Sequence, residues 1–299
     1  MSSSHEIDVV KCYGVHPWFL HQANEDFEHY EHQIDDEEND EANTTATTDT
    51  QSTINKIPWL SYLRHKIKSD PSSQVGEIGL DGARYDPITK DLVSPLNVQV
   101  EAFEAQMHLA ADMGRTVSVH AVRAWGPLMD AMRKVKSTRN KVRKERKAFA
   151  RDRARNKEKE QVPEDRGEGK NPQAISEQNK YFTLPPRIYF HAFGGKGAII
   201  DQLDAICRDS AETFYGFAPV INFRSHKTAS VIQKVGIDRL VLESDLEDHT
   251  RVMGDLKANV KYIAEALEMD ENDVLLKTSE NARRLYQLDN RSCMISTSN

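Results

Sequence analysis

Residues 75–81 read Val-Gly-Glu-Ile-Gly-Leu-Asp, a short apolar run that carries a glutamate and gives way to a helix-like stretch. Three further apolar runs end on a histidine or an aspartate: Thr-Val-Ser-Val-His at 116–120, Arg-Ile-Tyr-Phe-His at 187–191 and Arg-Leu-Val-Leu-Glu-Ser-Asp at 239–245. In a parallel (β/α) barrel the carboxyl ends of the strands meet at one mouth, which brings distant segments together. We therefore predict an α/β fold, a (β/α) barrel, with a metal site formed by Glu77, His120, His191 and Asp245.

The length of 299 residues allows one such barrel or two smaller domains. Strand-like and helix-like stretches alternate along the chain, which favours parallel βα units in a single domain over residues 1–299. Besides the four runs, strands are expected at 7–13 and 213–217. Helices are expected at 56–68, 101–113, 197–208, 225–235 and 251–268, with another that begins near 126 and a short one that contains Asn281.

Two segments interrupt this alternation. Residues 35–53 are acidic and then rich in Asn and Thr, and we expect a disordered insertion there. Residues 137–183 are basic and show no face that could be buried, so we expect either a long solvated helix or disorder, with Pro163 and Gly167 favouring disorder near the end.

The net charge of −7 hides a strong asymmetry. Residues 133–159 carry 14 Lys and Arg against 3 acidic residues, so the rest of the chain is strongly acidic. An acidic body is a poor general binder of nucleic acid, and any contact with nucleic acid has to be local.

Membrane and secretory classes are not expected. No apolar run approaches the roughly 18–20 residues of a membrane span, and nothing near Met1 resembles a secretory signal. The three cysteines are too few and too scattered for a disulfide framework. We expect a reducing cytoplasmic or nuclear location.

Each residue of the predicted metal site also has a structural interpretation. A single histidine at a strand end is more often a hydrogen-bonded structural group than a ligand. Glu77 could support a helix N-terminus, and Asp245 could form a turn. The coincidence of all four in barrel order favours a divalent ion such as Zn²⁺, Mn²⁺ or Mg²⁺.

The chain resembles the TatD-like, metal-dependent deoxyribonucleases of the amidohydrolase superfamily, which have a TIM-like barrel. Five sequence features carry this resemblance besides the apolar strand that ends at His120: Gly-Val-His-Pro at 14–17, Gly-Glu-Ile-Gly-Leu-Asp at 76–81, His-Ala-Phe-Gly-Gly at 191–195, Leu-Glu-Ser-Asp at 242–245, and Asn281 with Arg284-Leu285. They span the chain from about residue 7 to 287, apart from the two insertions.

The resemblance implies two divalent ions and hydrolysis of phosphodiester bonds, with DNA as the substrate. Glu77 would bridge the ions, and His120 and His191 would hold one of them. Asp245 would bind the other and orient or deprotonate the attacking water, which makes Asp245 and Glu77 the catalytic pair. His16, Arg123 and Gly195 would contact the substrate.

The family opens with a strand that carries His-x-His, and this chain has only His5 before its Gly-Val-His-Pro segment. Two βα units of the family barrel are therefore expected to be missing, and the barrel is expected to be incomplete at its N-terminus. We expect either a chain truncated by an incomplete gene model or a degenerate relative. Its first ion would keep only Asp245 and Glu77 as protein ligands.

Two other functions remain open at this stage. Some fungal members of the family are described as partners of cell-cycle proteins, and the charged insertions would be the surfaces for such a role. The superfamily's metal sites also hydrolyse amides and esters, and fold and ligands alone do not exclude that chemistry.

Overall fold

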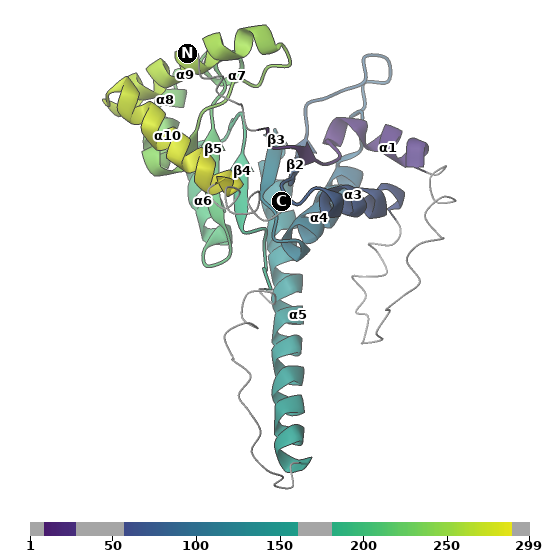
Figure 1. Cartoon of the computed structure of the whole chain (residues 1–299). Helices are drawn as coiled ribbons and strands as arrows, with labels where there is room; N and C mark the ends of the chain where they lie inside the picture. The colour runs from purple at the N-terminus through teal and green to yellow at the C-terminus, as the bar shows by residue number, and fades with distance from the viewer. Residues whose placement is uncertain (1–8, 28–56, 161–180, 289–299) are drawn as a thin grey trace, which may run out of the picture.

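The computed structural model describes residues 9–27, 57–160 and 181–288. Within them, six parallel strands form one sheet in sequential order (Figure 1). The strands are β1 (Cys12–Tyr13), β2 (Gln74–Asp81), β3 (Val117–Val122), β4 (Arg187–Phe190), β5 (Glu212–Gly216) and β6 (Leu240–Val241). Sequential parallel order is the arrangement of a (β/α) barrel, and β1 and β6 form the two edges of the described sheet.

Helices connect the strands and cover the sheet (Figure 1). They are η1 (Pro17–Phe19), α1 (Leu20–Phe27), α3 (Pro58–Ser69), α4 (Leu96–Asp112), α5 (Trp125–Glu160), α6 (Gly197–Cys207), α7 (Pro219–Asn222), α8 (Thr228–Val235), η4 (Ile237–Arg239), α9 (His249–Leu267) and α10 (Glu271–Tyr286). None of the helices in the described part of the chain is both long and apolar enough to cross a bilayer.

The expected strands match β2 to β6, with one difference of length. β6 has only two residues, because the chain leaves the ladder after Val241 to form the loop that carries Asp245. At the other edge, the part of the expected first strand that the structure describes is β1. Helices η1, α1, α7 and η4 were not expected from the sequence.

Buried apolar residues of the strands form the core. Ile78, Val119, Phe190 and Tyr215 have no exposed surface. A strand covered on both faces reads as a continuous apolar run, as β2 does. Glu77 is the one exposed residue among the eight of β2, so this strand points a single acidic side chain out of the core.

Two buried glutamines of α4 hold the ends of β1 and β2. The Gln106 amide accepts a hydrogen bond from Val15 N at 2.7 Å and donates to Val15 O at 3.1 Å. The Gln99 amide accepts from Asp81 N at 2.7 Å and donates to Asp81 O at 3.0 Å. Each side chain thus pairs with both backbone groups of one residue, as a neighbouring strand would.

Two buried asparagines do the same at the other side of the sheet. Asn259 of α9 donates to Phe217 O at 2.9 Å and to Glu243 O at 2.8 Å. Asn281 of α10 donates to Leu240 O at 2.8 Å. This contact gives a structural role to the asparagine that the closing motif of the sequence contains.

The basic segment is helical over much of its length. Helix α5 continues through residues 137–160, so the expectation of disorder is wrong there and the alternative of a long helix is confirmed. A buriable group is also present, because Arg139 is buried and donates to Asp112 Oδ1 and to Phe182 O, both at 2.7 Å. Residues 161–180, and the insertion expected at 35–53, lie outside the described residues.

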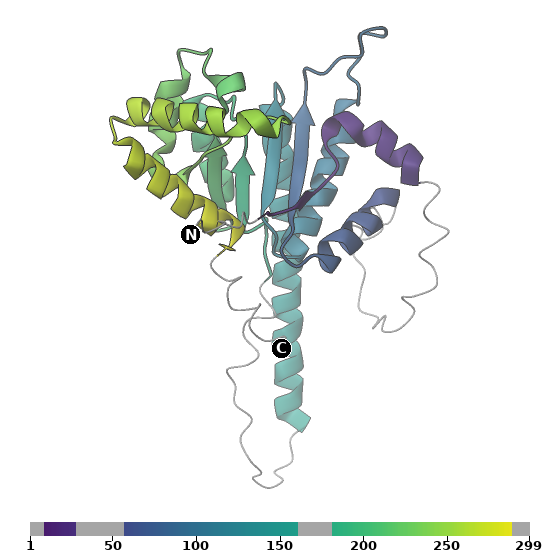
Figure 2. The same cartoon turned by 45° about the horizontal axis from the view of Figure 1, so that its top comes forward.

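The distal part of α5 projects from the body of the protein. Figure 2 shows the strand arrows pointing toward one end of the molecule and α5 leaving at the opposite end. The mouth formed by the strand ends and the far end of α5 therefore lie on opposite sides.

Replacing Gln99 by leucine should lower the free energy of unfolding by about 2–4 kcal/mol, because the backbone groups of Asp81 lose their partners without access to water. Urea denaturation measures this change. The matched control is Gln202→Leu on the exposed surface of α6, which should stay within about 0.5 kcal/mol of the parent. Equal effects of the two substitutions would contradict the role given to Gln99.

Candidate metal centre

The carboxyl ends of the strands surround a cavity of about 750 Å³. All four residues predicted as metal ligands line it, together with His16 from the segment after β1. Segments from five strand ends thus converge, as the barrel hypothesis required. The lining side chains are His16, Glu77, His120, His191 and Asp245.

Glu77 lies at the centre of this set. Its Oε1 is 3.5 Å from His191 Nε2, and its Oε2 is 3.9 Å from His16 Nε2. Two groups of possible ligand atoms share Glu77, one with His16 and His120 and the other with His191 and Asp245. Within each group the ligand atoms lie within 4.8 Å of one another. One carboxylate therefore faces both halves of the mouth.

This grouping differs from the one that the family resemblance implied. The resemblance put His120 and His191 on one ion and Asp245 on the other. In the structure His191 is grouped with Asp245, while the His120 and His191 rings are 5.6 Å apart between centroids. His16 also lies among the ligand groups and not only at the substrate side of the mouth.

Hydrogen bonds indicate which nitrogen of His16 carries a proton. His16 caps η1, and its Nδ1 accepts a hydrogen bond from Trp18 N at 3.2 Å. In a neutral ring the proton is then on Nε2, the atom that faces Glu77. Burial and the neighbouring His120 lower the pKa of His16 to about 4, so the neutral ring prevails at neutral pH. His16 is thus better suited to donate a hydrogen bond than to bind an ion.

His120 has the opposite arrangement. Its Nε2 lies 3.2 Å from Asp81 Oδ2, which also accepts from Trp18 Nε1 at 2.7 Å. Burial acts to raise the pKa of Asp81, but the hydrogen bonds from His120 and Trp18 outweigh it and lower the pKa to about 2. The ionised carboxylate fixes the proton on Nε2 of His120 and leaves Nδ1 free as a ligand atom. Such carboxylate–histidine pairs commonly orient metal ligands.

The ring of His191 is held by Ser118. Its Nδ1 is 3.3 Å from Ser118 Oγ, which leaves Nε2 directed at Glu77. Desolvation, with His120 and His16 nearby, lowers the pKa of His191 to about 3. A neutral imidazole with an unshared pair toward a carboxylate suits a divalent cation.

Glu243 lines the same cavity, and the sequence did not single it out as a site residue. Its Oε1 accepts from Ala192 N at 2.7 Å, and its Oε2 accepts from the Tyr189 hydroxyl. Desolvation raises the pKa of Glu243 to about 8 despite these hydrogen bonds. The side chain ties the loop of Asp245 to the backbone next to His191. Asp81 was likewise seen only as part of a motif, because its link to His120 is a tertiary contact.

The two candidate carboxylate ligands repel each other. Desolvation and the proximity of Asp245 raise the pKa of Glu77, and desolvation raises that of Asp245. A divalent cation between them would remove this penalty. Two carboxylates with two imidazoles are also the donor types that Zn²⁺, Mn²⁺ and Mg²⁺ accept, so the residues fit the group that the family implies.

Two residues predicted to contact the substrate do not line the cavity. Arg123 is exposed just after β3, at a left-handed backbone position with φ of 50°. Gly195 is buried against Phe193, and a β-carbon there would collide with the ring. The structure thus gives Gly195 a packing role, and Arg123 remains a surface cation beside the mouth.

Comparisons with solved structures agree with this fold. An amidohydrolase from Saccharomyces cerevisiae superposes with a TM-score of 0.55 at 14% identity, over 92% of this chain and 80% of that one. A TatD-family hydrolase from Entamoeba histolytica gives 0.53 at 12% identity, over 94% and 75%. At such identities the likeness shows the fold alone, which is the TIM-like barrel type predicted.

Sequence comparison identifies the family. The Cut9-interacting protein scn1 of Schizosaccharomyces pombe is 26% identical over 306 residues, which cover 94% of this chain and 84% of that protein. A model of the family described as TatD related DNase matches residues 1–287. Membership of this family supports a hydrolase. Because the match takes in nearly the whole chain, the chain belongs to the TatD-related DNase family, as its motifs predicted.

Proposed function

We propose that this protein is a divalent-metal-dependent hydrolase that cleaves phosphodiester bonds in DNA. The observation that carries the proposal is the position of Glu77, which belongs to two groups of possible ligand atoms in one cavity, with His120 in one and with His191 and Asp245 in the other. A shared carboxylate between two ligand groups is what a two-metal phosphodiesterase requires. The family description supplies DNA as the substrate class.

The protein ligands in this proposal are Glu77, Nδ1 of His120, Nε2 of His191 and Asp245. When bound, divalent ions would polarise the phosphoryl group and make a water molecule acidic enough to attack it. The remaining contributions come from the chain itself. Asp81 holds His120 in the tautomer needed for binding, and Glu243 fixes the backbone beside His191.

Asp245 and His16 have the roles closest to the reacting atoms. Asp245 is exposed to the cavity and is the carboxylate best placed to orient the attacking water and take its proton. His16 keeps a proton on Nε2, which can donate to a non-bridging oxygen of the phosphate. The proposal thus keeps His16 as a substrate contact and Asp245 with Glu77 as the catalytic pair.

A second candidate function is that of a protein-interaction partner in the cell cycle. The observation in its favour is the similarity to the Cut9-interacting protein scn1 along 94% of this chain. A Cut9-like protein from the same cells would be the partner. The two functions can coexist, because a docking surface need not include the mouth.

Replacing His191 or Asp245 by alanine should reduce metal-dependent cleavage of DNA by at least about 100-fold, since each change removes a candidate ligand. Cleavage of a labelled duplex with Mn²⁺ measures this. The controls are His65→Ala and Asp201→Ala, which alter exposed side chains that do not line the cavity. Activity that survives either site substitution would refute the assignment.

Glu77→Gln should abolish stabilisation of the fold by metal ions, because Glu77 belongs to both ligand groups. At an ion concentration about 100 times Kd, the parent should gain about 2.7 kcal/mol and melt at a higher temperature. Thermal melts with and without Mn²⁺ measure the shift in melting temperature and need no substrate. Glu280→Gln on the surface of α10 should keep the full shift, and a full shift in Glu77→Gln would contradict the ligand role.

The interaction role predicts that Asp245→Ala loses cleavage of DNA but still co-precipitates with the Cut9-like protein. Comparing the bound fraction of that partner for the parent and the variant provides the measurement. Equal loss of cleavage and binding would argue against a separate docking surface.

A further inference from the structure

Helix α5 leads from the mouth to a surface that hydrolysis does not use. Its first turns are packed into the body through Leu128, Met132 and Val135, all buried. Past Lys144, every side chain that the structure describes on α5 is exposed. At 1.5 Å per residue, the helix extends roughly 30 Å beyond Arg139. Figures 1 and 2 show this extension on the side opposite the strand ends.

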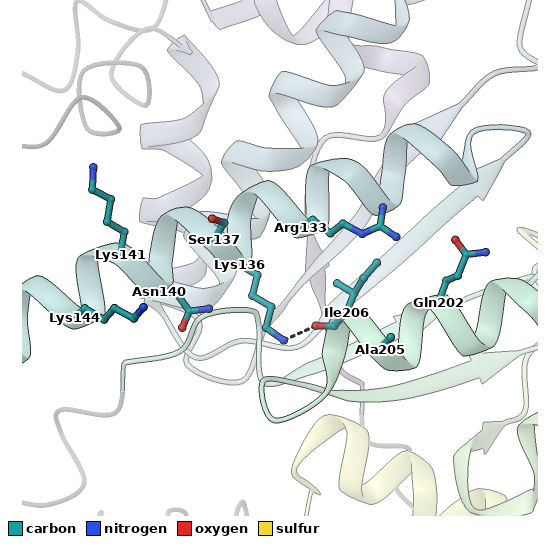
Figure 3. Close-up of a pocket in the computed structure, with 9 residues that line it drawn as sticks. All are labelled: Arg133, Lys136, Ser137, Asn140, Lys141, Lys144, Gln202, Ala205 and Ile206. Atoms are coloured by element: carbon teal, nitrogen blue, oxygen red, sulfur yellow. Dashed lines mark hydrogen bonds between the residues drawn. The ribbon is translucent and has the colours of Figure 1, made fainter.

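A groove of about 840 Å³ lies where α5 leaves the body, between α5 and α6 (Figure 3). Arg133, Lys141 and Lys144 of α5 line one side. Gln202, Ala205 and Ile206 of α6 line the other side, where Ile206 is largely buried. One wall is therefore cationic, and the other is uncharged and largely apolar.

Lys136 fixes the spacing of the two walls. Its ammonium donates to Ile206 O at 2.6 Å and to Arg208 O at 2.9 Å, at the carboxyl end of α6, as Figure 3 shows for the first of these bonds. A cation there satisfies the last carbonyls of the helix. The groove is therefore held by the fold before anything binds to it.

The cations of the groove are largely available. Arg133 pairs with Asp130 at 2.7 Å on the exposed surface. Lys141 and Lys144 have no ion-pair partner among the described residues. Spaced three residues apart, they lie on one face of α5, and Arg151 and Arg155 continue the exposed positive charge toward the far end.

We propose that this groove binds an acidic, amphipathic helical segment of a partner protein. Carboxylates of the segment pair with Lys141 and Lys144, and its apolar face covers Ala205 and Ile206. A third helix laid between two helices is a common mode of peptide recognition. The charge complementarity is strong, because residues 133–159 of α5 carry 14 Lys and Arg against 3 acidic residues in an otherwise acidic chain.

The observations favour a protein partner over nucleic acid. The projecting part of α5 leaves the body at the end opposite the strand ends (Figure 2), so a DNA segment in the cavity lies away from that part of the helix. Phe149 is the one aromatic residue on the projecting part of α5, which gives no platform for stacked bases. The uncharged wall formed by α6 adds nothing to the phosphate contacts on which non-specific DNA binding depends. The inference is independent of hydrolysis and gives the second candidate function a surface.

The test measures binding of a labelled 20-residue helical peptide, with glutamates on one face and leucines on the other, by fluorescence anisotropy. A scrambled peptide of equal charge and a 20-base-pair DNA duplex serve as competing probes. The parent should bind the ordered peptide at least about fivefold more tightly than the scrambled one, because only the former presents both faces. The double substitution Lys141→Glu with Lys144→Glu should weaken that binding about tenfold.

The matched control reverses Lys257 and Lys261, two exposed lysines of α9, and should change binding by less than about twofold. Thermal melts of all variants establish that they are folded, and cleavage of DNA should be unchanged by the Lys141 and Lys144 reversal. Asp245→Ala should bind the ordered peptide normally, so failure of the hydrolase proposal and failure of this one are distinct. Equal binding of the scrambled peptide, equal loss in the control, or tighter binding of the duplex that the same reversal removes would overturn the proposal.

Discussion

Hydrogen bonds from buried amides to the strand ends are the constraint on which the mouth depends. The described sheet has two free edges, so its outer strand ends lack the continuous ladder that a closed barrel provides. Gln106 and Gln99 hold the segments next to His16 and Asp81, and Asn259 holds the loop of Glu243. Each amide comes from a helix packed outside the sheet. The helices therefore set the positions of the loops that carry the chemistry.

With the loops fixed, a second set of contacts determines what each histidine can do. Histidine occupies three positions of the mouth, but the hydrogen-bond partners of the rings differ. The backbone N–H of Trp18 donates to Nδ1 of His16, whereas the carboxylate of Asp81 is hydrogen-bonded to Nε2 of His120. One ring is thereby left with a proton to donate and the other with an unshared pair. Position alone does not assign these roles, because the tautomer follows from the neighbouring group.

The sequence allowed the fold and four converging side chains to be predicted, because both depend on local patterns. A strand that ends on a charged residue is visible in any single run, and β2 shows it most clearly, with Glu77 exposed in an otherwise buried strand. The contacts of Asp81 with His120, and of Glu243 with Ala192, join residues 39 and 51 positions apart, and no local pattern marks them. The contact of Gly195 with the Phe193 ring is a packing detail that no local pattern marks either.

The projecting part of α5 is difficult to explain by folding alone. A helix that is polar on all sides gains nothing from the core, and like charges at i,i+4 destabilise it by a few tenths of a kcal/mol per pair. Lys147–Arg151 and Arg151–Arg155 are two such pairs, and all three side chains are exposed. Lys, Arg and Ala favour the helix intrinsically, which accounts for its formation but not for its excess of positive charge. An acidic helix laid along α5 would turn this repulsion into attraction, so the charge pattern that costs stability in the free chain becomes favourable in a complex.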